Sequence, residues 1–96
     1  MRCEFSRKAV SDLEEIGDYI ARDNYKKALD FVEEIRKCCF AIASSPNAAP
    51  LRENLGTGIR MLSFGRYLIF YTTQNDNVKI ERVLHSARNL IPSFFN

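Results

Sequence analysis

Tryptophan is absent from this sequence of 96 residues, histidine occurs once, and cysteine occurs three times. A single histidine and no CxxC spacing give no basis for a zinc site, so we expect no metal and no cofactor. Cys38 and Cys39 are adjacent, and a bond between neighbours on a helix would be strained. We therefore expect these two cysteines and Cys3 to stay reduced, as in a cytoplasmic protein.

Long apolar runs are also lacking. The longest have about five residues, whereas a membrane-spanning helix needs about 20. No signal peptide is visible, because Arg2 and Glu4 lead into a charged, periodic segment. A chain of this length usually folds around one core, so we expect a single α+β domain over residues 1–96.

An excess of positive charge is missing as well. Residues 1–48 hold eight Lys and Arg against nine Asp and Glu (8 − 9 = −1), and residues 49–96 hold six against three (6 − 3 = +3). The basic half has no run of Lys or Arg, although proteins that bind phosphate backbones usually carry a denser stripe. We therefore expect no direct binding of nucleic acid and no docking on a membrane.

The sequence does contain regular periodicity, and its first half has the period of two helices. A short strand at residues 2–5 precedes Ser6, the predicted N-cap of a first helix that ends near residues 21–24. Its apolar stripe consists of Val10, Leu13, Ile16 and Ile20. The second helix begins after Asp23 or Asn24 and ends at residues 44–46. Its apolar stripe consists of Ala28, Phe31, Val32, Ile35, Cys38, Cys39 and Ile42. The short connection predicts an antiparallel helical hairpin.

The second half has the period of β-strands. A loop at residues 44–58 leads to strands at residues 58–64 and 67–73, and Gly65-Arg66 between them fits a type II′ hairpin turn. A second turn at residues 74–77 precedes a third strand at residues 78–85. The order is β-α-α-β-β-β, which predicts a helical hairpin packed on a small antiparallel sheet.

Arg82 interrupts the pattern of the last strand, because it shares its parity with apolar residues. Either a bulge changes the facing near Arg82, or the arginine lies at the edge of the apolar face. Burial without a partner would be costly, so we favour the edge position or a paired arrangement.

Four segments together resemble the ParE branch of the RelE/ParE toxin superfamily. They are "AVSDLEEIGDYIARDN" (9–24), "KALDFVEEI" (27–35), "IRMLSFGRYLIFY" (59–71) and "IERVLHSARN" (80–89). The resemblance covers nearly the whole chain in the correct order. It implies the toxin of a type II toxin–antitoxin system, which inhibits DNA gyrase by protein–protein contact and is neutralised by a ParD-like antitoxin.

RelE proteins of the same superfamily cut messenger RNA on the ribosome, so a ribonuclease is the alternative. Cleavage needs a base, an acid and cations around the phosphate. The candidates for these roles are Arg60, Arg82, His85 and Arg88. The chain departs from a nuclease, because no tyrosine follows Tyr71 and the C-terminus is "PSFFN". We favour a toxin that is not an enzyme; a degenerate toxin or another target is a third possibility.

Each of these residues also has a purely structural explanation. His85 at a strand end can be a surface residue that forms hydrogen bonds, and Arg60 and Arg88 can pair with Glu53, Glu81 or a chain terminus. Phe94 and Phe95 can fold back onto the sheet, or leave apolar surface exposed for a partner.

The two expected partners have different candidate surfaces. Mixed surfaces of aromatic residues and arginine are typical of binding hot spots. The candidates for contact with gyrase are Arg82, His85, Arg88, Phe94 and Phe95. An antitoxin that is disordered until it binds would use apolar ground on the helical hairpin. The candidates for this contact are Leu13, Ile16, Ile20, Val32 and Ile35, although the stripes can equally be core.

Overall fold

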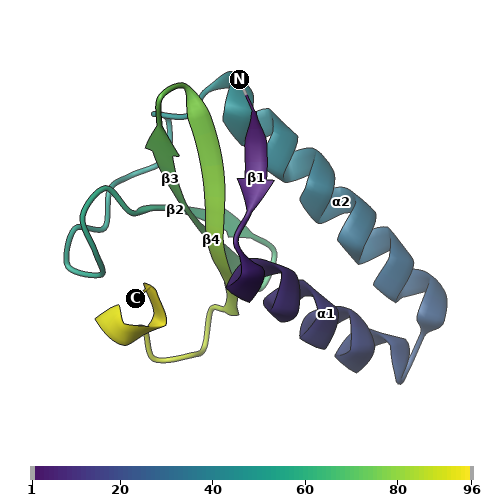
Figure 1. Ribbon diagram of the computed structural model, residues 1–96. Coiled ribbons are helices and arrows are strands. Elements are labelled where there is room, and N and C mark those ends of the chain that lie inside the picture. Colours follow the sequence, from purple (N-terminus) through teal and green to yellow (C-terminus); the bar gives the residue numbers. More distant parts are fainter. Residues whose placement is uncertain (1, 96) are drawn as a thin grey trace.

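The computed structural model describes residues 2–95 and contains two helices beside a four-stranded sheet (Figure 1). The elements in chain order are β1 (Cys3–Phe5), α1 (Arg7–Ala21), α2 (Tyr25–Ser44), β2 (Arg60–Phe64), β3 (Tyr67–Gln74), β4 (Asn77–His85) and a 3-10 helix, η1 (Pro92–Phe95). This order confirms the predicted β-α-α-β-β-β succession. None of the helices within residues 2–95 has the length and apolar character needed to cross a membrane.

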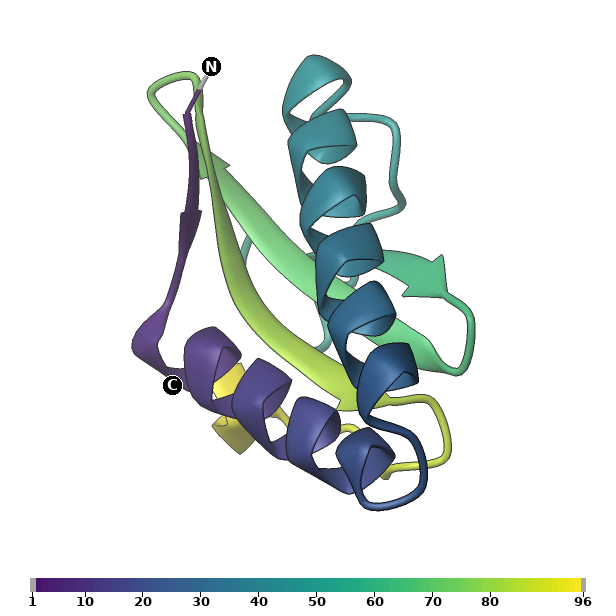
Figure 2. The ribbon, with the colours of Figure 1, turned by 90° about the vertical axis from the view of Figure 1, so that its right-hand side faces the viewer.

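Both helices begin at the caps that the sequence indicates. The Ser6 hydroxyl accepts a hydrogen bond from the Ala9 amide at 2.9 Å, and the Asn24 side chain accepts one from the Lys27 amide at 3.1 Å. These bonds satisfy amide groups that have no partner within the first turn of a helix. From the short connection, α1 and α2 diverge as the two arms of a V (Figure 2). The predicted hairpin is therefore present, but its arms lie side by side only near the connection.

The sheet has the strand order β1-β4-β3-β2. The pairs β2–β3 and β3–β4 are antiparallel, as predicted, whereas β1 pairs with β4 in parallel, with Cys3 opposite Val78 and Phe5 opposite Ile80. The sheet is therefore mixed rather than wholly antiparallel. Parallel neighbours need a long crossover, and here the chain between β1 and β4 includes both helices.

Both hairpin turns require backbone conformations that most residues avoid. Gly65 has φ +57° between β2 and β3, and no other residue of that turn has a positive φ, which agrees with the predicted type II′ turn. In the turn between β3 and β4, Asn75 and Asp76 have φ 49° and 65°. Two successive positive values are typical of a type I′ turn, and its twist matches that of the flanking strands.

A bulge in β4 explains the irregular facing of this strand. Phe70 pairs with Arg82, but the next residue of β3, Tyr71, pairs with Ile80, so that Glu81 is the extra residue. As a result, Ile80 and Val83 both join the apolar cluster under the helices. The bulged backbone is also held by α1, because the Ser6 hydroxyl donates to the Glu81 carbonyl oxygen at 2.7 Å.

Apolar side chains pack on both faces of the sheet. On one face, Ile35 and Cys39 of α2 and Ala9 of α1 are buried against β3 and β4. On the other face, Phe70 and Leu84 form a second cluster, which the loop before β2 and the C-terminal segment cover. Phe94 and Phe95 are half-buried there, so they fold back onto the sheet (Figure 1).

Candidate functional site

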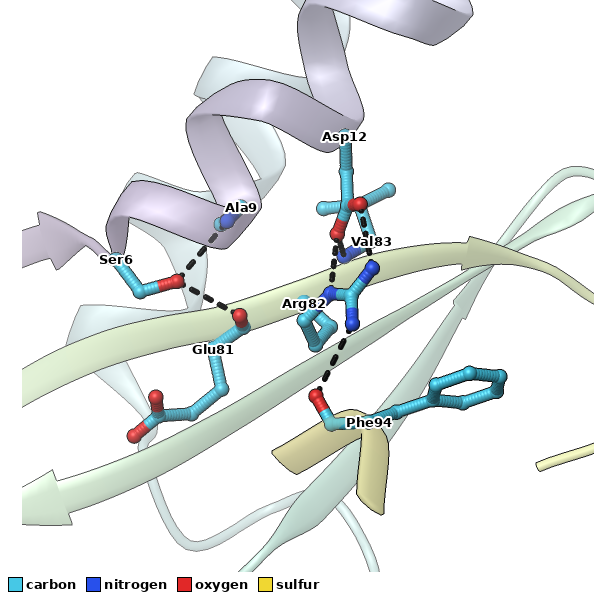
Figure 3. Close-up of polar contacts among 7 residues, drawn as sticks. All are labelled: Ser6, Ala9, Asp12, Glu81, Arg82, Val83 and Phe94. Carbon is cyan, nitrogen blue, oxygen red and sulfur yellow. Dashed lines mark hydrogen bonds and ion pairs between the residues drawn. The ribbon is translucent and has the colours of Figure 1, made fainter. Parts of the chain in front are cut away.

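Arg82 of β4 lies at the centre of the polar contacts that join α1, β4 and η1 (Figure 3). Its Nε donates to Oδ2 of Asp12 at 2.7 Å, and its Nη2 donates to Oδ1 at 2.7 Å. The two side chains are 13% and 7% exposed. The hydrogen bonds to Asp12 raise the pKa of Arg82, although burial opposes this shift. Arg82 is thus paired with Asp12. The sequence suggested a bulge or a paired arginine, and the structure contains both.

The same arginine also contacts the C-terminal segment. Its Nη1 donates to the carbonyl oxygen of Phe94 at 3.1 Å (Figure 3). The guanidinium carbons of Arg82 and Arg88 lie 5.6 and 4.7 Å from the centroid of the Phe94 ring. Both distances are within the range of cation–π attraction. The structure therefore brings Arg82, Arg88 and Phe94 together, while Phe95 packs edge-on against Phe70 at 4.9 Å.

His85 lies apart from this group. Its imidazole is exposed and packs edge-on against Tyr67, with the ring centroids 5.4 Å apart. Tyr67 in turn contacts Phe31 of α2, so His85 belongs to the helix-covered side of the sheet. Its Nδ1 accepts a hydrogen bond from the Ala87 amide at 3.0 Å. This hydrogen bond agrees with the structural explanation of His85, in which it is a surface residue that forms hydrogen bonds.

Arg60 lies on the opposite face of the sheet from Arg82. It pairs with Tyr71, whose side chain belongs to the cluster under the helices, whereas Arg82 pairs with Phe70 of the opposite cluster. The Arg60 Nη1 donates to the carbonyl oxygens of Asn47 and Ala49 at 3.2 and 2.6 Å. Residues directly opposite in an antiparallel pair share a face. The four nuclease candidates are therefore divided between the faces and do not converge.

Ion pairs of Arg60 or Arg88 with Glu53 or Glu81 are also not observed within residues 2–95, and the chain termini lie outside the described residues. Glu53 instead accepts from the Gly58 amide, and Glu81 accepts from the Thr72 hydroxyl at 2.9 Å. In the same range, no group of three His, Cys, Asp or Glu side chains is placed to hold a metal ion. All three cysteines are free.

The arms of the helical hairpin enclose an apolar groove of about 740 Å³. Several apolar side chains in its lining are exposed to solvent, namely Val10, Tyr25, Leu29 and Phe40, at 44%, 70%, 55% and 64%. Glu14 and Asp18 of α1 and Arg36 of α2 add charge to the lining. The groove is thus an apolar surface with charged groups on both arms.

The predicted antitoxin contacts coincide with this groove only in part. Leu13 and Val32 line it, whereas Ile16 and Ile20 are half-buried and absent from the lining. Ile35 is 0% exposed, so it is a core residue and cannot contact a partner in this conformation.

Sequence reasoning missed the exposed groove residues because it followed the core stripe. A signal was present: a second stripe with helical spacing runs along α2. Its members are Tyr25, Leu29, Val32, Arg36 and Phe40.

Comparisons with known proteins agree with this fold. A family model described as "ParE toxin of type II toxin-antitoxin system, parDE" matches residues 3–90. Eleven chains of solved structures match. One of them, described as "Chromosomal ParDE TA system from P. aeruginosa", has a TM-score of 0.75 and 24% sequence identity over 88% of this chain and 95% of that chain. No curated protein matches.

Proposed function

This chain belongs to the ParE toxin family of type II toxin–antitoxin systems, and from that premise we propose that it inhibits DNA gyrase by protein–protein contact in the cytoplasm. We further propose that it is not an enzyme and that a ParD-like antitoxin neutralises it. The observation that carries the proposal is the separation of Arg60 and His85 from the Arg82–Phe94–Arg88 group. A nuclease needs its acid, base and cations around one phosphate.

The surface that we propose for gyrase is the end of β4 with the segment behind it. Arg88 and His85 are exposed, and the Phe94 ring lies beneath Arg88. Arginine and aromatic residues are enriched among the anchors of protein interfaces. Arg82 is largely buried, so its contribution is to hold this surface in place rather than to face gyrase directly.

The surface that we propose for the antitoxin is the groove between α1 and α2. An amphipathic segment buries its apolar side chains in such a groove and keeps its charges at the rim. Glu14 and Asp18 on one arm and Arg36 on the other can pair with such charges. Exposed apolar surface of this kind is typical of a binding site on a soluble protein.

Two assays on the purified chain test the target. The chain is incubated with gyrase and relaxed DNA, and separately with translating ribosomes and a messenger RNA. We expect loss of supercoiling and intact messenger RNA. We also expect His85→Ala to inhibit gyrase nearly as well as the native chain and Arg88→Glu to inhibit it at least about tenfold less. Cleavage of messenger RNA on the ribosome with unaffected gyrase would reverse the assignment.

A matched pair of variants tests the groove. Leu29 lines the groove and is 55% exposed, whereas Leu51 is 47% exposed and absent from the groove lining. We expect Leu29→Glu to weaken binding of the antitoxin encoded by a neighbouring reading frame by about tenfold or more, because it places a charge in apolar ground. Leu51→Glu should bind as the native chain does. Equal affinities for both variants in titration calorimetry would place the antitoxin elsewhere.

A further inference from the structure

Asp12 of α1 is bonded to β4, which is 70 residues away in the sequence. Its carboxylate accepts three hydrogen bonds: from Nε and Nη2 of Arg82, and from the amide of Val83 at 3.0 Å (Figure 3). Both oxygens of a carboxylate that is 7% exposed are thereby satisfied. The bidentate contact fixes the plane of the guanidinium group as well as its position.

Because Nε and Nη2 of Arg82 are bonded to Asp12, Nη1 of the guanidinium group is available for another acceptor. Nη1 points away from Asp12 and donates to the Phe94 carbonyl oxygen (Figure 3). Within residues 2–95, this is the hydrogen bond that joins η1 to the sheet. The other contacts of η1 with the sheet are those of aromatic rings, including Phe95 on Phe70. The ring contacts involve side chains, whereas this hydrogen bond connects Arg82 to the backbone of the segment.

We propose that Asp12 is a positioning residue, which acts through Arg82 to hold the C-terminal segment 90–95 against the second face of the sheet. The inference rests on the proposed function in one respect: the segment so held contributes Phe94 to the surface that we assign to gyrase. When the segment is in place, Phe70 and Leu84 remain 0% and 2% exposed. Asp12 therefore organises a surface that it does not itself form.

The geometry of the guanidinium group makes it possible to distinguish the positioning role of Asp12 from a general structural role. Lysine in place of Arg82 keeps a positive charge opposite Asp12, but its single ammonium group cannot serve Asp12 and the Phe94 carbonyl in the same fixed geometry. Asparagine in place of Asp12 keeps the size of the side chain and removes the charge that orients the guanidinium group. Each substitution interrupts the connection from α1 to η1 at a different point.

Trimming by carboxypeptidase measures whether the segment is attached, because the enzyme removes residues only from a detached chain end. The full chain and the variants Asp12→Asn, Arg82→Lys and Asp30→Asn are digested, and the loss of Phe95 and Phe94 is followed by mass spectrometry. Asp30→Asn is the matched control, since it makes the same change at an exposed position of α2 that is absent from the groove lining. Amide exchange of Ile69, Phe70 and Tyr71 reports the stability of the sheet in the same samples.

We expect trimming to become about tenfold faster in Asp12→Asn and in Arg82→Lys, which is the effect of losing one charge-assisted hydrogen bond. Loss of the buried charge pair lowers the global stability, but the sheet amides should still open far less often than the segment detaches, and Asp30→Asn should behave as the native chain does. If Asp12→Asn fails to fold, Arg82→Lys carries the test. The proposal is overturned if folded variants are trimmed at the native rate, or if trimming is no faster than the opening of the sheet that amide exchange measures.

The assay contains no gyrase, so failure of the proposed target leaves its result intact. Where the native chain does inhibit gyrase, Asp12→Asn and Arg82→Lys should inhibit it about tenfold less, and Asp30→Asn should inhibit it equally. Inhibition that is unchanged in variants with a detached segment would separate the two conclusions. The segment would then be positioned by Asp12, but the gyrase surface would lie elsewhere.

Discussion

The ion pair between Asp12 and Arg82 is almost fully removed from water, with side-chain exposures of 7% and 13%. Removing one partner from such a pair leaves a charge that is neither solvated nor compensated. The pair between Arg2 and Glu4 provides the contrast, because its atoms are 3.8 Å apart and its side chains are 75% and 52% exposed. Water screens a pair of the second kind almost completely.

We therefore expect Asp12→Asn to lower the free energy of unfolding by about 3 kcal/mol, because it leaves Arg82 buried without a counter-charge. Glu4→Gln should change it by less than about 0.5 kcal/mol. Urea denaturation of the two variants and the native chain measures both values. Similar losses of unfolding free energy in the two variants would show that the buried ion pair stabilises the fold no more than the exposed pair does.

The role of Asp12 could not be predicted from its place in the sequence. It lies between apolar positions of an amphipathic helix, as Glu14, Glu15 and Asp18 do, and these three are exposed. Asp12 differs only because Arg82, which is 70 residues away, lies beside it in the fold. Sequence reasoning recognised that Arg82 needed a partner or an edge position, since an unpaired buried charge is costly. It had no means of identifying the partner.

Cys39 provides a pH dependence of known sign. Burial raises the pKa of its thiol from 9.0 to about 12, and the neighbouring thiols of Cys3 and Cys38 add to the shift. The folded chain therefore keeps a proton that the unfolded chain loses near pH 9, so the stabilisation is complete below pH 9 and is lost as the pH rises.

We expect the free energy of unfolding of the native chain to fall by about 1 kcal/mol more than that of Cys39→Ala between pH 8 and pH 10. Urea denaturation at both pH values measures the difference. The variant controls for the other groups that titrate in this range, such as lysine and tyrosine. Parallel losses in the two proteins would contradict the assignment to Cys39.

At the scale of secondary-structure elements, the two helix N-caps differ in the hydrogen bonds that their side chains form. Ser6 caps α1 and also donates to the Glu81 carbonyl oxygen of the bulge at 2.7 Å. Asn24 caps α2 in an exposed position and has no such second contact within the part of the chain that the structure describes. Ser6 therefore connects the start of a helix to an irregularity in the sheet.

We expect Ser6→Ala to cost about 2 kcal/mol of stability, of which about 1 kcal/mol comes from the cap and the rest from the Glu81 carbonyl. Asn24→Ala should cost about 1 kcal/mol or less. Thermal or urea unfolding gives both values. A larger loss in Asn24→Ala would mean that the contact with the bulge contributes nothing.

The elements that the sequence predicted correctly are those with local causes. Both caps, both turns and the three strands of the meander follow from residues close together in the chain. The parallel pairing of β1 and the pairing of Arg82 with Asp12 join segments 70 residues or more apart. Periodicity within one element contains no information about such contacts, so the predicted sheet lacked its parallel pair.

At the scale of the whole molecule, aromatic side chains serve two separate purposes. Phe95 is half-buried against the sheet, where its ring meets that of Phe70, whereas Phe40 is 64% exposed in the groove between the helices. Only the first contributes to the stability of the isolated chain. The antitoxin-contact residues predicted from the sequence likewise included both core and groove residues. Ile35 is buried in the core, whereas Val32 of the same helix lines the groove.

We expect Phe95→Ala to lower the free energy of unfolding by about 2 kcal/mol, less than a fully buried phenylalanine would. Phe40→Ala should change it by less than about 0.5 kcal/mol. Both values come from urea denaturation of the chain without its antitoxin. A substantial loss in Phe40→Ala would mean that the groove residues also stabilise the fold.

The parallel pairing of β1 with β4 also has a consequence for the order of events during translation. The ribosome makes residues 3–5 more than 70 residues before their neighbours in the sheet, residues 78–80. Contacts between such distant segments form late, because a long loop has to close first. A nascent chain that stops in the loop before β2 has two helices and no sheet for them to cover. Newly made molecules therefore complete the four-stranded sheet only after residues 78–80 have been made.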